Sequence, residues 1–384
     1  MNGELVRVGD VLRLARRDVV VEPEKQYLEI GISSFGKGIF HKEPVEGVAL
    51  GAKRVFRIEP GDLVISNVFA WEGAIALAGD TESGRIGSHR FMTFVARNDR
   101  IDLRWAAWFF VSEPGLELIR KASPGSAGRN KTLAIERFKN LVIPLPPIEA
   151  QQRVAQRLGS LSGIATCILD ELEGNPAETF TAALPGIYDH IVSSGPTILS
   201  RLANLVDFLS DTIHLGDDPG EASEFVGLQH VDGDTGICLG SDPIDELKGR
   251  KFRFRPGDVV YGYLRPYLNK VWLADRDGLC SVDQYVLRPK PDVNGELLAF
   301  SLRGRAVLDR SIELTHNLQL PRLRSGLLAD TPILLPDVER AAPSLKRLNE
   351  ARSAAIELRS KRGRQRSVAA SIVPAALREA FGAF

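Results

Sequence analysis

Two nine-residue stretches, FRIEPGDLV at Phe56–Val64 and FRFRPGDVV at Phe252–Val260, reveal how this chain is organised. They lie 196 residues apart. A single Pro-Gly-Asp turn between strands is common, because proline presets φ and glycine tolerates positive φ. Several collinear matches at one spacing indicate instead an internal duplication. The same offset also pairs Gly31 with Gly227, and Leu77-Ala78 with Leu273-Ala274.

Each copy ends in a proline-marked segment that leads into a helical pattern. The first segment is LVIPLPP at Leu141–Pro147, and its counterpart 190 residues later is TPILLPD at Thr331–Asp337. The second helical stretch, roughly Val338 to Phe381, has a weaker seam but is rich in good helix formers. We expect breaks at Gly174-Asn175-Pro176 and Pro185-Gly186 in the first stretch, and near Gly363 and at Pro374 in the second. Apolar residues in the first stretch follow a heptad spacing: Val154, Leu158, Leu161, Ala165, Ile168 and Leu172.

Between the helical stretches lie short runs rich in β-branched and aromatic residues, which predict strands. A shorter helix is expected in each copy, near Leu103–Val111 and Glu296–Arg303. The sequence therefore predicts two mixed α/β domains with β-rich centres. Their expected order is a first domain at 1–146, a helix region at 147–195, a second domain at 196–336 and a helix region at 337–384.

Composition places the chain among soluble globular proteins, with 44% hydrophobic and 26% charged residues in a length of 384. It has no long apolar run and no apolar segment near the start, so we expect a cytoplasmic protein. Three widely separated cysteines, Cys167, Cys238 and Cys280, provide neither a disulfide framework nor zinc-site spacing. The formal net charge of zero conceals local clusters of basic residues.

Catalytic motifs are weak. GISSFGKG at Gly31–Gly38 comes close to a phosphate-binding loop, but Gly38 stands where a magnesium-binding hydroxyl is required. Glu246 and Lys248 offer part of a Mg²⁺-dependent nuclease site, but no suitable upstream carboxylate precedes them. The six histidines show no metal-ligand spacing. We therefore interpret the chain as a binding protein with no cofactor of its own.

Local clusters of basic, amide and aromatic side chains are suited to nucleic acid, because cations meet phosphates while amides and guanidinium groups reach base edges. Such clusters recur in both copies. For each residue the alternative remains open that it is a solvated charge or, for the aromatics, part of the core. The predicted DNA contacts are Asn67, Trp71, Arg120, Lys121, Arg129, Asn130 and Lys131 in the first copy, and Lys251, Arg253, Tyr263, Arg265, Asn269, Lys270, Asn317, Gln319 and Arg322 in the second.

The run IPLPPIEAQQRVAQRL at Ile143–Leu158, followed by a heptad helix and then by a second domain with PGDVVYGYLRP, resembles the specificity (S) subunit of Type I restriction-modification systems. The resemblance implies two target recognition domains related by pseudo-twofold symmetry, each reading half of a split DNA sequence. It also implies that the two long helices pack as an antiparallel coiled coil that sets the spacing.

Such a subunit is non-catalytic and docks two methyltransferase subunits, which use S-adenosylmethionine, and in some assemblies ATP-dependent restriction subunits. The second segment keeps Pro336 and Glu339 but has Asp337 and Ala341 where the first has proline and glutamine, which leaves docking at that end open. The residues that we expect to form the docking region are Pro146, Pro147, Glu149, Gln152, Val154, Leu158, Leu161, Leu345 and Leu348.

Two alternatives remain: a Mg²⁺-dependent DNA nuclease that uses Glu246 and Lys248, and a protein-interaction scaffold that binds no DNA. Steep salt dependence of DNA binding would separate the S-subunit interpretation from the scaffold, because phosphate neutralisation releases counterions.

Overall fold

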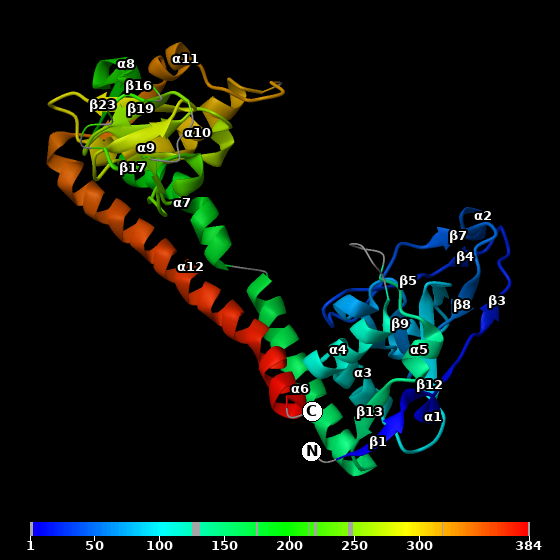
Figure 1. Cartoon of the computed structure of the whole chain (residues 1–384). Coiled ribbons are helices and arrows are strands. Elements are labelled where there is room, and N and C mark those ends of the chain that lie inside the picture. Colours follow the sequence, from blue (N-terminus) through cyan, green and yellow to red (C-terminus); the bar gives the residue numbers. More distant parts are fainter. Residues whose placement is uncertain are drawn as a thin grey trace. The chain divides into compact units, whose positions relative to one another are not determined.

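The computed structural model describes residues 3–382 except for 125–130, 174–175, 215, 219, 221, 245–248 and 317; the side chains of residues 176–178 are also outside the description. The chain divides into two compact units (Figure 1). Unit 1 comprises residues 1–171 and 366–384, and unit 2 comprises residues 172–365. Each unit therefore combines a globular part with portions of long helix.

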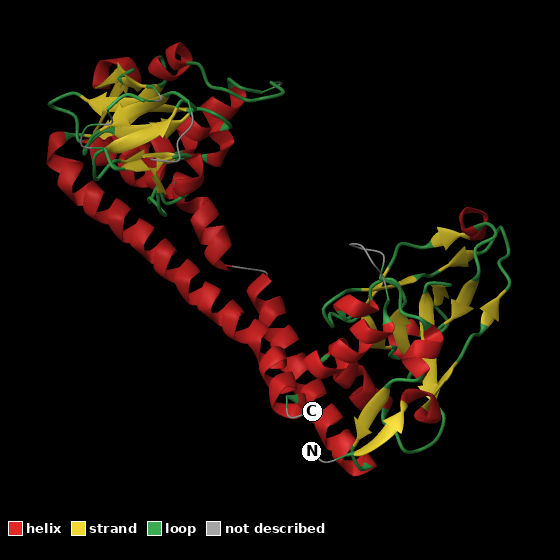
Figure 2. Ribbon diagram, viewed as in Figure 1, coloured by secondary structure: helices red, strands yellow, loops and turns green. Residues whose placement is uncertain are grey.

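Unit 1 is built on small antiparallel sheets, covered by short helices (Figure 2). Its largest sheet has the order β10 (Ile75–Leu77), β9 (Leu63–Ser66), β12 (Phe91–Ala96) and β2 (Leu12–Leu14), and a second has the order β11 (Ile86–Ser88), β8 (Val55–Arg57) and β3 (Asp18–Val19). Three strand pairs are β1 (Glu4–Arg7) with β13 (Val142–Leu145), β4 (Gln26–Tyr27) with β7 (Val45–Glu46), and β5 (Ile30–Ile32) with β6 (Ile39–His41). The helices are α1 (Val8–Val11), α2 (Gly47–Leu50), α3 (Leu103–Val111), α4 (Glu113–Ala122), α5 (Ile135–Lys139) and α6 (Ile148–Glu173), with single 3₁₀ turns at Ala70–Glu72 and Asp80–Glu82.

Unit 2 repeats this plan. Its four-stranded sheet has the order β15 (Val206–Leu209), β23 (Gln284–Pro289), β20 (Val259–Gly262) and β21 (Val271–Leu273). A five-stranded sheet contains β16 (Thr212–Ile213), β19 (Lys251–Phe254), β22 (Gly278–Ser281), β17 (Glu224–Val226) and β18 (Asp242–Pro243), and β14 (Thr197–Arg201) pairs with β24 (Pro332–Pro336). The helices are α7 (Pro176–Ser193), α8 (Leu202–Leu205), α9 (Gly295–Arg303), α10 (Arg305–Glu313), α11 (Ser325–Ala329) and α12 (Val338–Phe381), with 3₁₀ turns at Leu228–His230 and Pro266–Leu268.

The two Pro-Gly-Asp turns occupy matching places, as the duplication predicts. Each precedes the inner strand, β9 or β20, of a sheet whose four strands have the same order in both units. The turn aspartates, Asp62 and Asp258, are both buried at 1% exposure. Asp62 accepts two hydrogen bonds from Arg17, at 2.6 and 3.0 Å, and Asp258 accepts two from Arg288, both at 2.8 Å. A buried carboxylate is stable only with such partners, so both copies keep the same arrangement.

In each unit an aromatic side chain of a long helix packs against an aromatic side chain of a helix beside the sheets. In unit 1 the last turn of α12 runs antiparallel beside α6, and Phe381 packs edge-on to Trp105 of α3 with centroids 6.0 Å apart (Figure 1). In unit 2, Tyr188 of α7 packs on Phe300 of α9 at 5.0 Å. The first three turns of α6 and α12 also match, because Leu158 and Leu348, each the eleventh residue of its helix, are both buried in these cores.

Three of the predicted helix breaks are wrong. α7 continues through Pro185, and α12 continues through Gly363 and Pro374. A proline inside a helix removes one backbone hydrogen bond and strains the preceding turn. Packing of the flanking residues offsets this cost, because Leu184 and Tyr188 are fully buried around Pro185, as is Phe381 after Pro374. Gly174 and Asn175 lie outside the described residues, so a break there stays a prediction.

Candidate nucleic-acid interface and docking segment

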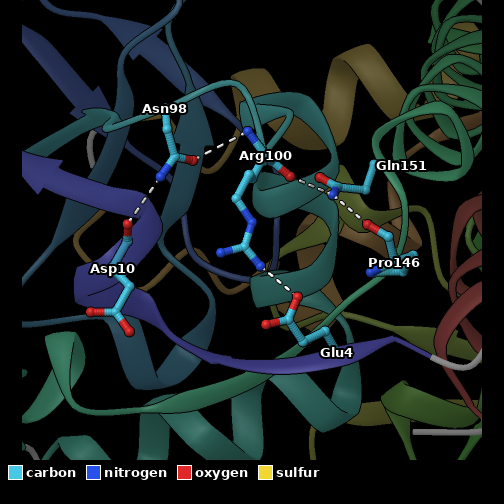
Figure 3. A network of polar contacts seen from close by, with 6 residues as sticks. All are labelled: Glu4, Asp10, Asn98, Arg100, Pro146 and Gln151. Atoms are coloured by element: carbon cyan, nitrogen blue, oxygen red, sulfur yellow. Dashed lines mark hydrogen bonds and ion pairs between the residues drawn. The ribbon is translucent and has the colours of Figure 1, made fainter.

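The segment Pro146–Gln152 joins β13 to α6, and its central residue is Gln151, which is fully buried (Figure 3). The Gln151 Oε1 accepts a hydrogen bond from the backbone N–H of Asp102 at 2.9 Å. Its Nε2 donates to the carbonyl oxygens of Arg100 and Pro146, both at 2.8 Å. One side chain thus satisfies three backbone groups, and its contact with the Pro146 carbonyl is buried. The start of α6 is fixed in this way to the loop before α3.

The same network reaches the first strand of the unit (Figure 3). Arg100 donates to Glu4 of β1 at 2.6 Å, and its backbone N–H donates to the Oδ1 of Asn98 at 3.2 Å. Asn98 in turn donates to the carbonyl oxygen of Asp10 at 3.2 Å. The Glu4–Arg100 pair is exposed on both sides, and such pairs contribute at most about 1 kcal/mol. The buried amide of Gln151, rather than this ion pair, therefore determines the geometry of the segment.

Gln151 is the glutamine of the first segment that Ala341 replaces in the second, but the predicted docking residues include its neighbour Gln152 instead. Gln152 is exposed, as are Pro147 and Glu149, so these three can meet a partner directly. Pro146, Leu158 and Leu348 are buried within their own units, and Val154, Leu161 and Leu345 pack partly against the same cores. The signal for the buried position of Gln151 was its spacing, because Gln151 lies three residues before Val154 and seven before Leu158 and so continues the apolar seam of α6.

The corresponding segment of unit 2 is stabilised by different residues. Asp337 caps α12, because its Oδ1 accepts a hydrogen bond from the backbone N–H of Arg340 at 3.0 Å. The Arg340 guanidinium donates to the carbonyl oxygens of Ile191, Val192 and Pro196, at 3.2, 3.3 and 3.1 Å. These carbonyls lie at and beyond the end of α7, where a cation is favoured. Unit 2 has Ala341 at the position of Gln151, and Arg340 takes over the stabilising role of that glutamine.

Unit 1 brings two of the predicted DNA contacts, Lys131 and Trp71, together. The Lys131 ammonium lies 5.0 Å from the centre of the Trp71 ring, and the Trp71 Nε1 donates to the Val68 carbonyl at 3.0 Å. The carbonyl of Asn67 accepts from Leu133, and the buried Oδ1 of its side chain has no hydrogen-bond partner among the described residues. An exposed Phe69 lies beside them in sequence. A ring and a cation at one place have the chemistry that base stacking and phosphate contacts need.

Other predicted contacts of unit 1 are dispersed. Arg120 forms an exposed ion pair with Glu113 at 2.7 Å, and Lys121 is exposed on the same helix, α4. Arg129 and Asn130 lie outside the described residues. Arg120 and Lys121 have the exposure that phosphate contacts need, but neither is held next to Trp71 by any described hydrogen bond.

In unit 2 three of the predicted DNA contacts are used inside the fold. Asn269 has a φ of 50° and is 6% exposed, and its Nδ2 donates to the Arg303 carbonyl at 3.1 Å. Lys270 donates to the Val231 carbonyl. Tyr263 donates to the Val282 carbonyl at 2.6 Å and stacks on Tyr285, and burial raises its pKa. The polar groups of these three side chains are thus bonded to backbone carbonyls of unit 2, whereas Arg265 of the same turn is exposed.

The remaining contacts predicted in unit 2 lie at its surface or on β19. Arg265, Gln319 and Arg322 are exposed, with Arg322 3.4 Å from Asp283. Lys251 lies 5.4 Å from the centre of the Phe225 ring, and Arg253 pairs with Asp211 at 3.5 Å. Phe254 is fully buried, which confirms that the alternate face of this strand is core. Asn317 lies outside the described residues.

The structure also shows where the weak catalytic motifs of the sequence lie. Within the described residues no group of three or more His, Cys, Asp or Glu side chains could hold a metal ion. The stretch Gly31–Gly38 runs from β5 through a turn to β6 rather than into a helix, so it lacks the phosphate cradle of a nucleotide-binding loop. Glu246 and Lys248 lie outside the described residues. None of the described helices is sufficiently long and apolar to span a bilayer.

The chain is similar to a curated protein and to solved structures. No family model matches the chain. A curated relative, the Type I restriction enzyme EcoDI specificity subunit of Escherichia coli, is 26% identical over 155 residues, which are 40% of this chain and 32% of the relative. The match thus spans about a third of that relative's length.

Two solved structures are similar over nearly the whole chain. The HsdS subunit from Thermoanaerobacter tengcongensis has a TM-score of 0.60 and 18% identity, covering 99% of this chain and 96% of that one. A chain from work on complex assembly and conformational transition of the type I R-M system has a TM-score of 0.70 and 19% identity, covering 99% and 97%. The mixed, β-rich α/β fold with long helices is therefore confirmed. The curated relative supports the resemblance to Type I specificity subunits.

Proposed function

We propose that this chain, which has the fold of the specificity subunits of Type I restriction-modification systems, is the non-catalytic DNA-recognition subunit of such a system. The observation that carries the proposal is the repetition of one folded unit, each copy joined to long helices and each presenting basic and polar side chains at its surface. Two similar readers in one chain suit a DNA target that is split into two halves. The place of action is the cytoplasm, where the chromosome is accessible.

Each unit reads one half of the target. In unit 1 the reading surface is centred on Trp71 and Lys131. In unit 2 it is formed by the exposed Arg265, Gln319 and Arg322. Cations contact phosphates, while amides and guanidinium groups can form paired hydrogen bonds with base edges in the major groove. Linking two weak readers raises the overall affinity, because the second binding event becomes intramolecular.

The long helices set the spacing between the half-sites and dock the catalytic partners. Helix length determines distance at about 1.5 Å per residue. Two methyltransferase subunits, which bind S-adenosylmethionine, dock beside the helices and methylate adenines that are flipped out of the duplex. The exposed Pro147, Glu149 and Gln152 form part of the docking surface of unit 1. ATP-dependent restriction subunits join the assembly where the system also cleaves DNA.

Mapping of methylated adenines across the genome tests this function. A strain carrying the gene should show one bipartite motif in which both halves are methylated, and deletion of the gene should abolish methylation at that motif. The purified assembly should bind the motif with an affinity that falls steeply with salt. Unchanged methylation after deletion, or salt-independent binding, would contradict the proposal.

A further inference from the structure

A pocket of about 350 Å³ lies in unit 1 between the turn at Gly36–Gly38, the strand β10 and the helices α3 and α6. None of the proposed DNA-reading residues lines it. Its entrance carries two exposed cations, Lys37 and Arg104. Its walls are mainly apolar and small: Ile75, Ala76, Leu77, Ala107, Trp108, Val111, Ala155, Gly159 and Ser162.

The duplication identifies the matching place in unit 2. Helices α3 and α9 begin at equivalent caps, Asp102 and Asn294, whose side chains each accept a hydrogen bond from the second backbone N–H of the helix. This offset of 192 residues places Arg303 where unit 1 has Val111 and Phe300 where it has Trp108. Along α6 and α12 the offset is 190, as the buried Leu158 and Leu348 show. It places Asn349 and Arg352 where unit 1 has Gly159 and Ser162.

In unit 2 this place is filled by the chain's own side chains. The Arg303 guanidinium lies 4.7 Å from the centre of the Phe300 ring and donates to the Val271 carbonyl at 3.0 Å. The Arg352 guanidinium lies 4.8 Å from the same ring and pairs with Glu296 at 3.2 Å. Val271 belongs to β21, the counterpart of the strand β10 that lines the pocket. At three of the matching positions unit 1 has smaller residues, Val111, Gly159 and Ser162, and there the space is open.

We propose that the pocket of unit 1 receives a side chain of the methyltransferase subunit, namely an aromatic or aliphatic anchor next to an acidic residue. This inference rests on the proposed function. The apolar walls and the Trp108 ring suit the anchor, since interface energy concentrates in buried aromatic contacts. The cations at the entrance suit the neighbouring carboxylate.

The charges around the pocket do not suit the arrangement of unit 2, in which an arginine side chain enters the site. There the inserted Arg352 is paired with Glu296, whereas the equivalent residue of unit 1 is Arg104. An incoming arginine would thus meet a like charge. Asp102 already accepts hydrogen bonds from the Arg104 guanidinium. Burial alone would raise the pKa of Asp102, but these hydrogen bonds hold it below its usual range. An acidic residue of the partner, next to its apolar anchor, is instead attracted, because the net charge at the entrance of the pocket is positive.

The location favours a protein over DNA as the occupant. Residues of α6 form one wall, and the exposed Glu149 and Gln152 lie two to three turns earlier on the same helix. A partner lying along α6 can therefore contact both places. Duplex DNA would need several cations along its phosphates, whereas the pocket has two cations and a mainly apolar lining.

Two glycines on α6 provide a matched pair of variants. A Cβ on Gly159 or on Gly163 would meet no atom within 4 Å, and both residues are exposed, but only Gly159 lines the pocket. Calorimetric titration of the full chain with its methyltransferase subunit gives the Kd and the stoichiometry. With Gly159→Phe the Kd of one of the two sites should rise at least about tenfold, as expected for loss of a buried anchor. With Gly163→Phe both sites should stay within about twofold of the wild type.

A second pair keeps the test decisive if either phenylalanine variant fails to fold, as judged by thermal unfolding. Ser162→Arg introduces the residue that unit 2 carries, and Ser160→Arg is its control on the exposed side of α6. Equal affinities in both members of a pair, or equal weakening of both methyltransferase sites, would overturn the inference. So would loss of DNA binding by the chain with methyltransferase binding intact, which would indicate a nucleic-acid occupant. A wild-type chain that binds no methyltransferase would instead refute the proposed function itself.

Discussion

The two units share a sheet but differ at the junction where each long helix begins. Around the sheet, Asp62 and Asp258 keep the same pairing with an arginine, although Arg17 follows β2 and Arg288 lies on β23. At the junction, the buried amide of Gln151 is replaced by a capping aspartate and by Arg340, which binds the end of α7. The comparison shows that a buried carboxylate tolerates little change, whereas backbone groups at a helix start can be satisfied in more than one way.

The largest effect is expected at the shared turn aspartates. Asp62→Ala and Asp258→Ala should each lower the free energy of unfolding of their own unit by about 3 kcal/mol, because each leaves an arginine and a backbone N–H without their acceptor. Urea denaturation followed by hydrogen exchange in each unit measures both losses. Clearly unequal losses would show that the two turns are not energetically equivalent.

A smaller effect is expected at the junction. Gln151→Ala gives unit 1 the residue that unit 2 has at Ala341, but without a compensating arginine. It should cost about 2 kcal/mol, since three backbone groups lose their partner. Gln152→Ala, at an exposed neighbour, is the control and should stay within about 0.5 kcal/mol. Similar values for both variants would mean that the network in Figure 3 does not stabilise the junction.

The smallest effect concerns an acid-sensitive contact of unit 1. Burial alone would raise the pKa of Glu82, but hydrogen bonds from His41, Gly79 and Thr81 hold it below its ordinary value of 4.5. Because the folded-state pKa is lowered, the stabilisation is present above pH 4.5 and is lost as the pH falls through the folded-state value.

Glu82→Gln should therefore lower the stability of unit 1 by about 1 kcal/mol at pH 7, and the difference should shrink below pH 4.5. Thermal unfolding of both proteins between pH 3 and pH 7 is the measurement. Gly278 stands at the matching position of unit 2, so the acid sensitivity from this contact should be confined to unit 1. A difference that is constant with pH would contradict the assignment.

The features predicted correctly from sequence are those encoded by local motifs. The repeated Pro-Gly-Asp stretch predicted matching sheets, and Pro146-Pro147 predicted the start of α6 at Ile148. The prediction failed where distant packing decides. Pro185 and Pro374 do not end their helices, because buried neighbours hold both flanks in place.

The reading surface was only partly predictable for a related reason. Trp71 and Lys131 are far apart in sequence, and the fold brings them together. Asn269 and Lys270 have equally suitable side chains, but these donate hydrogen bonds to backbone carbonyls within unit 2. Composition cannot distinguish these cases, since the direction of a loop side chain depends on backbone angles that are set by the surrounding fold. The pocket beside Trp108 was also invisible, because it arises from small residues on segments that meet only in three dimensions.

The packing of Phe381 against Trp105 and Phe109 has a consequence for biosynthesis. Residues 172–365 contain all the partners that their own unit needs, whereas the unit that is translated first lacks part of its core until residue 381 has left the ribosome. The later half can therefore complete its tertiary structure before the earlier half does. During that interval the apolar face around Trp105 is a natural target for chaperones, and a nonsense mutation near codon 370 would damage the N-terminal reader rather than the nearer one.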